Sequence, residues 1–315
     1  MPRKLIIGCG YLGRRVASRW IDAGDTVFAL TRGEHRATEL REMGIEPILG
    51  DVTQPESLAE LPAADAVLYA VGFDRAAGHS MRGVYVDGLR NVLDRLAATT
   101  RRFVYISSTS VYGQTDGEWI DEDSPCEPVR ENGEICLEAE QCVWRAFPSL
   151  EQLKTELDQM KGQISLHELE AMLFGRFFDA LQRRAYILRL AGLYGPGRLL
   201  RRVEAVRSGE PIDGNPDALL NLIHVDDAAA AVDACLERGQ PGRTYLICDD
   251  RPVTRREYFE TLARHLSAPP PVFNADAETT RTAGLNKRCR NRRMKDELHV
   301  ALRFPTFEEG LPNGV

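Results

Sequence analysis

A glycine-rich turn near the N-terminus constrains the fold more than any other feature of this sequence. The apolar residues 5–7 run directly into Gly8-x-Gly10-x-x-Gly13, and a segment with helical spacing of apolar residues follows. In this setting the first glycine makes a tight turn, the second admits a pyrophosphate, and the third lets the helix pack on the strand. The unpaired N–H groups of the helix then face the phosphates. The turn therefore predicts a dinucleotide site formed by Gly8, Gly10, Tyr11, Leu12 and Gly13.

Strand-like apolar runs alternate with helix-like segments along most of the chain. The predicted strands are 4–7, 26–30, 46–51, 64–72, 102–108, 185–190 and 244–249, and the intervening helices include 34–43 and 84–98. Short, continuously apolar strands that alternate with helices are typical of a parallel sheet covered on both faces. We therefore expect an α/β protein with a doubly wound parallel Rossmann sheet.

The segment 148–184 breaks this alternation, because its pattern predicts two consecutive helices. Capping-box patterns occur at 149–152 and 165–168, and Gly162 separates two stripes of apolar residues. The segment predicts an inserted helical hairpin. A packed surface elaboration, a lid over a pocket and the contact of a homodimer all remain open for it.

The end of the second predicted strand indicates which dinucleotide is bound. A site for NAD(H) usually carries an acidic residue here, which binds the ribose 2′-hydroxyl. This chain has Thr31 and Arg32 instead, with Arg36 one helical turn further on. Because a guanidinium suits a 2′-phosphate, we expect NADP(H) to be favoured, while NAD(H) remains possible.

Composition and charge limit the partners. The 315 residues carry a net charge of −7, which gives no electrostatic reason to expect nucleic acid or a membrane surface. No apolar run reaches membrane-spanning length, and the first strand leaves no room for a signal peptide. Seven scattered cysteines without ligand spacing indicate thiols in a reducing compartment and no metal site. We therefore expect a cytoplasmic protein with a small-molecule substrate.

Basic residues gather once, in the run 287–295, where six of nine residues are Lys or Arg. Two interpretations remain open for this run. It clamps an acidic or phosphorylated substrate, or it is a solvated helix start that is capped by Asn291 and balanced by Asp296 and Glu297.

Several short motifs together resemble one protein family. They are the glycine turn, Gly50-Asp51-Val52, Ala70-Val71-Gly72, Ser107-Ser108-Thr109-Ser110-Val111-Tyr112-Gly113, Leu193-Tyr194-Gly195-Pro196-Gly197-Arg198 and Ile223-His224-Val225-Asp226-Asp227. Their combination resembles the extended short-chain dehydrogenases/reductases, the NAD-dependent epimerase/dehydratase group. The resemblance covers nearly the whole chain apart from 148–184.

The resemblance implies roles for individual residues. Asp51 and Val52 would contact the adenine, Ala70, Val71 and Gly72 would lie along the cofactor, and Ser108 would sit beside the nicotinamide.

The resemblance also implies a domain division. Residues 1–192 would form the dinucleotide-binding domain with the hairpin inserted at 148–184, and 193–315 would form mainly a small substrate lobe. Residues 222–249 would return to the Rossmann sheet. The candidates for substrate contact are Asn132, Tyr194, Arg198 and His224.

The chain departs from the family at its most functional pair. The family uses a tyrosine and, four residues later, a lysine that lowers the tyrosine pKa and holds the ribose. Aligned on Gly133, these positions hold Asn132 and Cys136, and the sequence contains no Tyr-x-x-x-Lys. We interpret Cys136 as a packing residue. Because the tyrosine–lysine pair is missing, the family's standard proton-transfer mechanism cannot be carried over to this chain.

A proton must then come from elsewhere. The candidates are Tyr112, a water ordered by Ser108 and Asn132, and the substrate itself; Glu134 and His224 are other candidates. Tyr112 is also readily explained as a packed residue of its turn.

Two functions follow from this pattern. The first is an atypical NADP(H)-dependent oxidoreductase that acts on a small polar or nucleotide-linked substrate with a non-standard proton donor. The alternative is a catalytically silent NADP(H)-binding module that reports redox state. The missing tyrosine–lysine pair favours the module, whereas Ser108 and a substrate lobe favour the enzyme.

Overall fold

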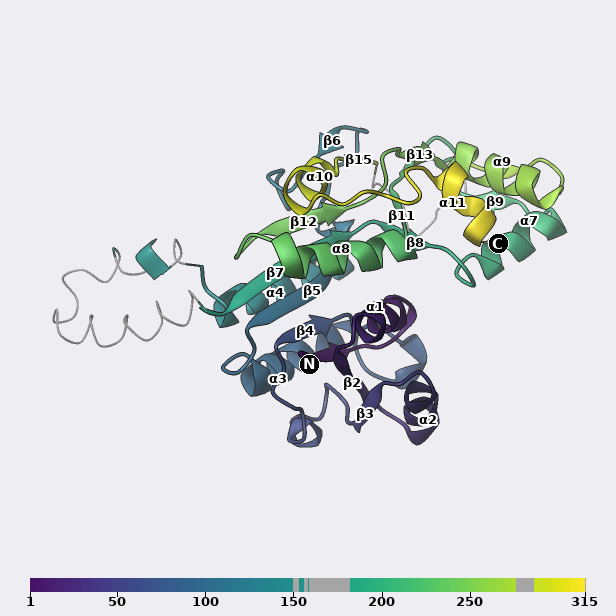
Figure 1. Ribbon diagram of the computed structural model, residues 1–315. Coiled ribbons are helices and arrows are strands. Elements are labelled where there is room, and N and C mark those ends of the chain that lie inside the picture. The colour runs from purple at the N-terminus through teal and green to yellow at the C-terminus, as the bar shows by residue number, and fades with distance from the viewer. Residues whose placement is uncertain (150–152, 156–157, 159–181, 276–285, 315) are drawn as a thin grey trace. The chain divides into compact units, whose positions relative to one another are not determined.

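The computed structural model describes residues 1–149, 153–155, 158, 182–275 and 286–314 (Figure 1). Most of the predicted hairpin 148–184 therefore lies outside the described residues, and its possible roles stay predictions. The elements of the first half of the chain are β1 (Arg3–Ile7), α1 (Tyr11–Asp22), β2 (Thr26–Thr31), α2 (Glu34–Glu42), β3 (Glu46–Leu49), η1 (Pro55–Leu58), β4 (Ala66–Tyr69), η2 (Arg75–Ala77), η3 (Gly83–Asp87), α3 (Gly88–Leu96), β5 (Arg102–Ser108), η4 (Thr109–Val111), β6 (Trp119–Ile120) and α4 (Glu131–Ala146).

The elements of the second half are mostly shorter. They are β7 (Arg184–Leu190), β8 (Gly192–Tyr194), α7 (Leu200–Ser208), β9 (Ile212–Asp213), β10 (Leu219–Leu220), β11 (Leu222–His224), α8 (Val225–Arg238), β12 (Thr244–Ile247), β13 (Val253–Thr254), α9 (Arg255–Leu266), β14 (Phe273–Asn274), β15 (Arg288–Cys289), α10 (Arg292–Leu298) and α11 (Phe307–Gly314).

A Rossmann-like α/β sheet is the centre of the fold, as the alternation of strands and helices predicted. Among the described residues, seven strands form one sheet in the order β12-β7-β5-β4-β1-β2-β3. Strand β1 pairs in parallel with β2 and β4, and the β2–β3 and β4–β5 pairs are also parallel. The order reverses beside β1, so the carboxyl ends of β1 and β4 form a switch point, where ligands of such sheets bind.

The strands bury both of their faces, which explains their continuous apolar character. Alternate residues of a strand point to opposite sides of a sheet. The buried side chains on one face pack with α3 and α4, and they include Leu5, Ile7, Val67, Tyr69, Phe103 and Tyr105. The residues between them, Ile6, Leu68 and Val104, are equally buried.

The predicted helix 84–98 differs from the observed structure at its start. A π-helical turn, η3, precedes α3, and the N–H of Gly88 closes it on the carbonyl oxygen of Gly83. A Cβ on Gly88 would lie 2.7 Å from Cγ2 of Val52, so the helix packs closely on that residue here. The regular helical period cannot reveal such a turn, because the turn contains one extra residue per hydrogen-bonded ring.

The chain divides into two compact units. The first comprises Met1–Ser107, Glu134–Leu188 and Cys235–Thr244, and the second comprises Ser108–Gly133, Arg189–Ala234 and Tyr245–Val315. The functional division expected from the sequence, with a substrate lobe mainly in 193–315, stays a prediction.

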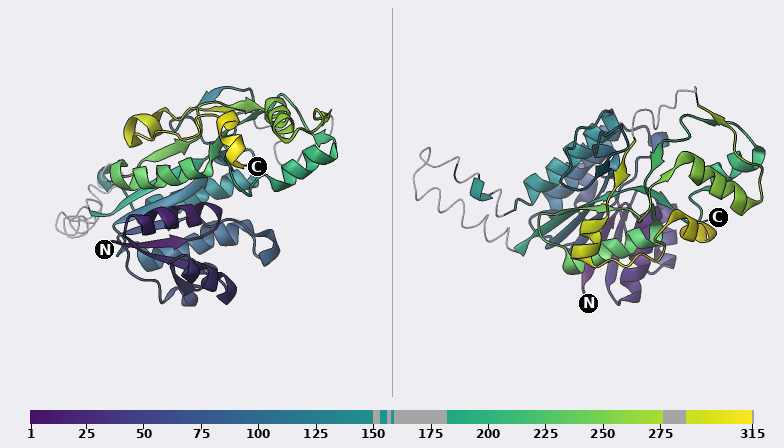
Figure 2. Two further views of the ribbon diagram at one scale, coloured as in Figure 1. Left: turned by 45° about the vertical axis from the view of Figure 1, so that its right-hand side comes forward. Right: turned by 90° about the horizontal axis from the view of Figure 1, so that it is seen from above.

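Within the second unit, α7, α9 and α11 enclose a small core. Helices α7 and α9 lie side by side in every view (Figures 1 and 2). The buried residues of this core include Leu199, Val203, Tyr258, Leu262 and Phe307.

Candidate functional site

The first residue of the glycine turn can only be glycine. Gly8 follows β1 with a φ of +94°, a conformation that side-chain-bearing residues rarely adopt. A Cβ at this position would also lie 2.5 Å from the carbonyl carbon of Ala70 and 2.5 Å from the nitrogen of Val71. The turn is therefore locked against the segment that follows β4.

The other two glycines serve different purposes. A Cβ on Gly13 would lie 2.7 Å from the carbonyl oxygen of Gly8, so this position lets α1 pack on β1. A Cβ on Gly10 would meet nothing within 4 Å. No side chain caps α1 at Gly10, and its first turn holds no acidic residue. The open N-terminus of a twelve-residue helix fits a pyrophosphate group, because its dipole and N–H groups favour an anion.

The segment after β3 is held by its own side chains. Oδ1 of Asp51 accepts hydrogen bonds from the N–H and the hydroxyl of Thr53, each at 2.8 Å. The carbonyl oxygen of Val52 accepts one from the side-chain amide of Asn91 at 2.8 Å. These bonds fix the shape of the segment; the contact of Asp51 and Val52 with adenine stays a prediction.

The segment after β4 leads from the glycine turn to a tyrosine. Ala70 and Val71 lie against Gly8, and Gly72 is exposed. The N–H of the next residue, Phe73, donates a hydrogen bond to the hydroxyl of Tyr85 at 3.1 Å. Tyr85 stands on the π-helical turn η3. The sequence pattern did not single it out.

Arginines gather near the end of β2. Thr31 is buried, whereas the side chain of Arg32 is half exposed and lies 3.1 Å from a carboxylate oxygen of Asp74. Arg36 lies 2.6 Å from Glu39, and Arg14 of α1 binds the same carboxylate. Each of these guanidinium groups is paired with a carboxylate, and their contact with a 2′-phosphate stays a prediction. Arg14 was missed from the sequence because only the packing of α1 on α2 brings it to this place.

The positive charge of Arg36 also reaches the glycine turn. Burial raises the pKa of the Cys9 thiol to about 12, and the Arg36 guanidinium offsets part of this effect.

Ser108 is the last residue of β5, and its side chain is partly exposed. Its Oγ accepts a hydrogen bond from the N–H of Ser110 at 3.1 Å, which caps the short helix η4. The hydroxyl hydrogen can still be donated to a substrate oxygen.

Helix α4 carries Asn132 and Cys136, the residues that the sequence pattern predicted to lie at the family's tyrosine and lysine positions. Asn132 is exposed in the first turn of the helix, and the Cys136 side chain is buried. One turn later, the buried Glu140 accepts a hydrogen bond from the hydroxyl of Ser107 at 2.6 Å. A thiol and a carboxylate thus occupy the buried face of the helix.

Tyr112 is enclosed by two buried cations of the second unit. Its side chain is 0 % exposed, and its hydroxyl accepts a hydrogen bond from Arg189 at 2.7 Å. Its carbonyl oxygen accepts one from Nζ of Lys287 at 2.5 Å. Burial raises the pKa of Tyr112, although Arg189 opposes this, and burial lowers the pKa of Lys287 to about 8. The prediction that Tyr112 donates a proton to the substrate stays untested, and its burial favours a structural role.

The basic run 287–295 does not form a solvated helix start along its whole length. Lys287 is buried against Tyr112. Helix α10 begins only at Arg292, and the Asn291 amide does not cap it; the amide donates to the carbonyl oxygens of Cys248 at 3.0 Å and Asp249 at 3.1 Å. Asn291 therefore occupies the predicted N-cap position of α10, but its side chain makes no capping hydrogen bond. The expected balance is present at Arg292, which pairs with Asp296 at 3.0 Å.

Two of the candidate substrate contacts lie in the core of the second unit. Tyr194 is 1 % exposed and His224 is 0 % exposed, and their rings meet edge to face with centroids 5.2 Å apart. Phe304 covers the imidazole, with centroids 4.1 Å apart. Arg198 is exposed. The prediction that these residues touch a substrate therefore rests on the sequence alone.

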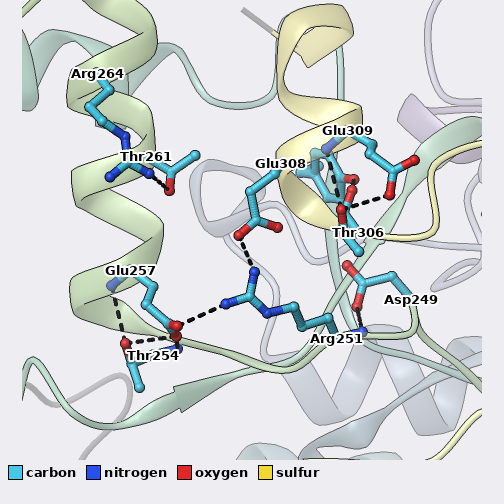
Figure 3. Close-up of polar contacts among 10 residues, drawn as sticks. Asp249, Arg251, Thr254, Glu257, Thr261, Arg264, Thr306, Glu308 and Glu309 are labelled. Carbon is cyan, nitrogen blue, oxygen red and sulfur yellow. Dashed lines mark hydrogen bonds and ion pairs between the residues drawn. The ribbon is translucent and has the colours of Figure 1, made fainter.

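A buried carboxyl group follows β12. Oδ1 of Asp249 accepts a hydrogen bond from the N–H of Arg251 at 3.2 Å, whereas Oδ2 is buried with no partner in the described part of the chain. The Arg251 guanidinium turns away and joins Glu257 at 2.9 Å to Glu308 at 2.5 Å (Figure 3). Burial, followed by the nearby Asp250, Glu308 and Asp227, raises the pKa of Asp249 to about 8.

The described residues contain neither a candidate metal-ion cluster nor a membrane-crossing helix. In the ranges 1–149, 182–275 and 286–314 and the few described residues between them, no group of three or more His, Cys, Asp and Glu could hold a metal ion. Over the same ranges, no helix has both the length and the apolar character needed to cross a bilayer.

Known proteins resemble this chain along nearly its whole length. Residues 5–147 match the model of the NAD-dependent epimerase/dehydratase family. Protein YeeZ of Escherichia coli K12 is 27 % identical over 310 residues, which are 97 % of each chain. The 4-hydroxy-2-methyl-3-oxo-4-farnesyl-3,4-dihydroquinoline-1-oxide ketoreductase of Stigmatella aurantiaca is 25 % identical over 88 % of this chain and 76 % of its own. The 2-alkyl-3-oxoalkanoate reductase of Shewanella oneidensis is 26 % identical over 83 % of this chain and 65 % of its own.

Solved structures agree with the fold. A functionally unknown conserved protein from Silicibacter pomeroyi is 28 % identical and covers 99 % of this chain and 97 % of its own, with a TM-score of 0.74. MoeE5 in complex with UDP-glucose and NAD has the same coverage and the same TM-score at 20 % identity, which supports the fold alone.

Proposed function

We propose that this chain is an NADP(H)-dependent oxidoreductase of the NAD-dependent epimerase/dehydratase family, whose model matches residues 5–147, and that it acts on the carbonyl or hydroxyl group of a small molecule. The open N-terminus of α1 at Gly10 carries the proposal, since it fits a dinucleotide pyrophosphate. The bound cofactor supplies or accepts a hydride. We place the reaction in the cytoplasm, for the reasons of composition given above.

A ketone is the substrate group that the comparisons favour. Two relatives that align with most of this chain are named as reductases of oxo compounds. A nucleotide-linked sugar stays the second candidate, because MoeE5 binds UDP-glucose. The silent redox module is not favoured, since two relatives that align with most of this chain are named as reductases.

The chain's own residues would bind and orient the reactants. The glycine turn would hold the pyrophosphate, and the arginines near the end of β2 would hold a 2′-phosphate. Ser108 would donate a hydrogen bond to the substrate oxygen. Neither Asn132 nor Cys136 supplies a phenol, so the proton would come from another group.

A substrate assay tests this proposal. Purified protein with NADPH should reduce a 2-alkyl-3-oxoalkanoate, measured by the loss of reduced-nicotinamide absorbance, and should turn over UDP-glucose slowly or not at all. Ser108→Ala should lower the ketone rate by about 100-fold, the effect of losing one positioned donor. Cys136→Ser should change it little. Fast turnover of UDP-glucose that survives Ser108→Ala would contradict the assignment.

Cofactor preference gives a separate test. We expect NADPH to bind more tightly than NADH, because Arg32 stands where an acidic residue would repel a 2′-phosphate. Arg32→Asp should weaken NADPH binding by about 10-fold or more, roughly the loss of one charge-assisted bond, and should leave NADH nearly unchanged. Arg41→Asp, on the exposed side of α2, is the matched control. Equal affinities of the wild-type protein for NADPH and NADH, measured by calorimetry, would refute the preference.

A further inference from the structure

We propose that Tyr85 is the proton donor of this oxidoreductase, in place of the tyrosine that the family carries on α4. The proposal rests on the reductase function proposed above. It arises from a residue that no motif marks, at the junction of the π-helical turn η3 with the segment after β4.

The π-helical turn sets the direction of the Tyr85 side chain. Val84 and Val86 on either side of it are buried, whereas Tyr85 is only partly buried. Its ring meets that of Phe73 edge to face, with centroids 6.4 Å apart. π-Helical turns are rare and occur frequently at functional sites. Here the turn places a phenol over the chain that leaves β4.

The hydroxyl of Tyr85 is anchored but keeps its hydrogen. Its oxygen accepts the hydrogen bond from the N–H of Phe73 at 3.1 Å. A phenol that accepts one bond can still donate its own proton. Phe73 directly follows Gly72, and the backbone of Ala70 lies against Gly8. The phenol is therefore fixed to the segment that is predicted to run along the cofactor, within the same compact unit.

The neighbouring tyrosines are less suited than Tyr85 to donate a proton to a substrate. Tyr69 and Tyr105 are 1 % and 3 % exposed, and the Tyr69 hydroxyl donates to the carbonyl oxygen of Val84 at 3.3 Å. Tyr112 is fully buried and bonded to Arg189. Tyr85 combines partial exposure with a fixed oxygen at the carboxyl end of β4.

Electrostatics keep Tyr85 protonated at neutral pH. Burial raises its pKa, the N–H of Phe73 opposes this, and the nearby Cys136 adds to the increase. The ionisable groups around it are Tyr69 on β4, Tyr105 on β5 and Cys136 on α4. A protonated phenol is the form that a donor to a carbonyl oxygen must have.

The step conserves atoms and electrons. A bound reduced cofactor would supply the hydride to the carbonyl carbon, and the Tyr85 O–H bond would break as its proton bonds to the carbonyl oxygen. The products are the alcohol, the oxidised cofactor and the Tyr85 phenolate, which takes a proton from water.

The first test needs no turnover. Phenolate absorbance is titrated with pH in the presence of NADP⁺ and of NADPH. The positive charge of the oxidised nicotinamide should lower the pKa of Tyr85 by about 1 unit or more, as a nearby opposite charge does, and NADPH should not. Tyr85→Phe should remove the NADP⁺-dependent change, while the buried control Tyr186→Phe should retain it. A change that persists in Tyr85→Phe would overturn the proposal.

The second test uses single-turnover reduction of a 2-alkyl-3-oxoalkanoate. Tyr85→Phe should slow the step by about 100-fold or more, within the range for loss of a general acid, and leave the Kd for NADPH within about threefold of the wild-type value. An unchanged rate would overturn the role of Tyr85. A wild-type protein that reduces no ketone would refute the reductase function, and the phenolate titration would then still decide whether Tyr85 faces the nicotinamide.

Discussion

Gly8→Ala should lower the free energy of unfolding by about 3 kcal/mol or more, since strain at a positive φ and a backbone collision act together. The new Cβ would lie 2.5 Å from backbone atoms of Ala70 and Val71, and β4 cannot move away because it is paired with both β1 and β5. Urea denaturation measures this loss. Cofactor binding should fail with it, because the turn and the segment after β4 share this contact.

Gly10→Ala is the matched variant in the same turn. Its Cβ would meet nothing within 4 Å, so the backbone collision of Gly8→Ala is absent and the loss of stability should be much smaller than for that variant. The Cβ would instead project into the space proposed for the pyrophosphate. We expect the Kd for NADPH to rise by about 10-fold or more, the scale of one lost charge-assisted hydrogen bond. Wild-type NADPH affinity in Gly10→Ala would show that the phosphates bind elsewhere.

The contrast between these glycines also shows what a sequence can predict. The motif Gly8-x-Gly10-x-x-Gly13 and the apolar run before it are local, and they predicted the strand, the turn and the helix. The seven-stranded sheet followed from the alternation of similar local patterns. The collision between Gly8 and Ala70 is a contact across the sheet, and only the pairing of β1 with β4 reveals it.

The candidate site was less predictable for the same reason. Arg32 follows β2 directly, so the sequence could name it as a candidate, whereas Arg14 reaches the same region only through its ion pair with Glu39 of α2. Lys287 contacts Tyr112 across 175 positions of sequence, and within its basic run it looked like a solvated residue. Tyr85 was hidden by the π-helical turn, which shifts it out of the regular helical period.

Asp249 gives the second large prediction, which concerns pH. An aspartate in an unfolded chain has a pKa of about 3.9, whereas the pKa of Asp249 in the folded protein is about 8. Between these values the folded state binds the proton that the unfolded state has released. Its contribution to stability is therefore fully present below about pH 4 and is lost as the pH rises toward 8. The negative charges of Asp227, Asp250 and Glu308 reinforce this effect of burial.

Asp249→Asn should remove that dependence. The amide can accept the hydrogen bond from the N–H of Arg251 and mimics the protonated carboxyl at the position of Oδ2, which has no other partner among the described residues. Urea denaturation at pH 8 should show the variant to be more stable than the wild type by about 3 kcal/mol. Each unit of difference between the folded and unfolded pKa of Asp249 corresponds to about 1.4 kcal/mol, and the expected value is smaller than the full difference would give. The difference should shrink as the pH falls and disappear below about pH 4, where the carboxyl is protonated in both the folded and the unfolded wild-type chain.

Asp217→Asn, at an exposed pair with Arg256, should change stability by less than about 1 kcal/mol at every pH. A difference between Asp249→Asn and the wild type that stays constant from pH 5 to pH 8 would mean that this carboxyl is already ionised in the folded protein, with water or a ligand supplying the partner that Oδ2 lacks.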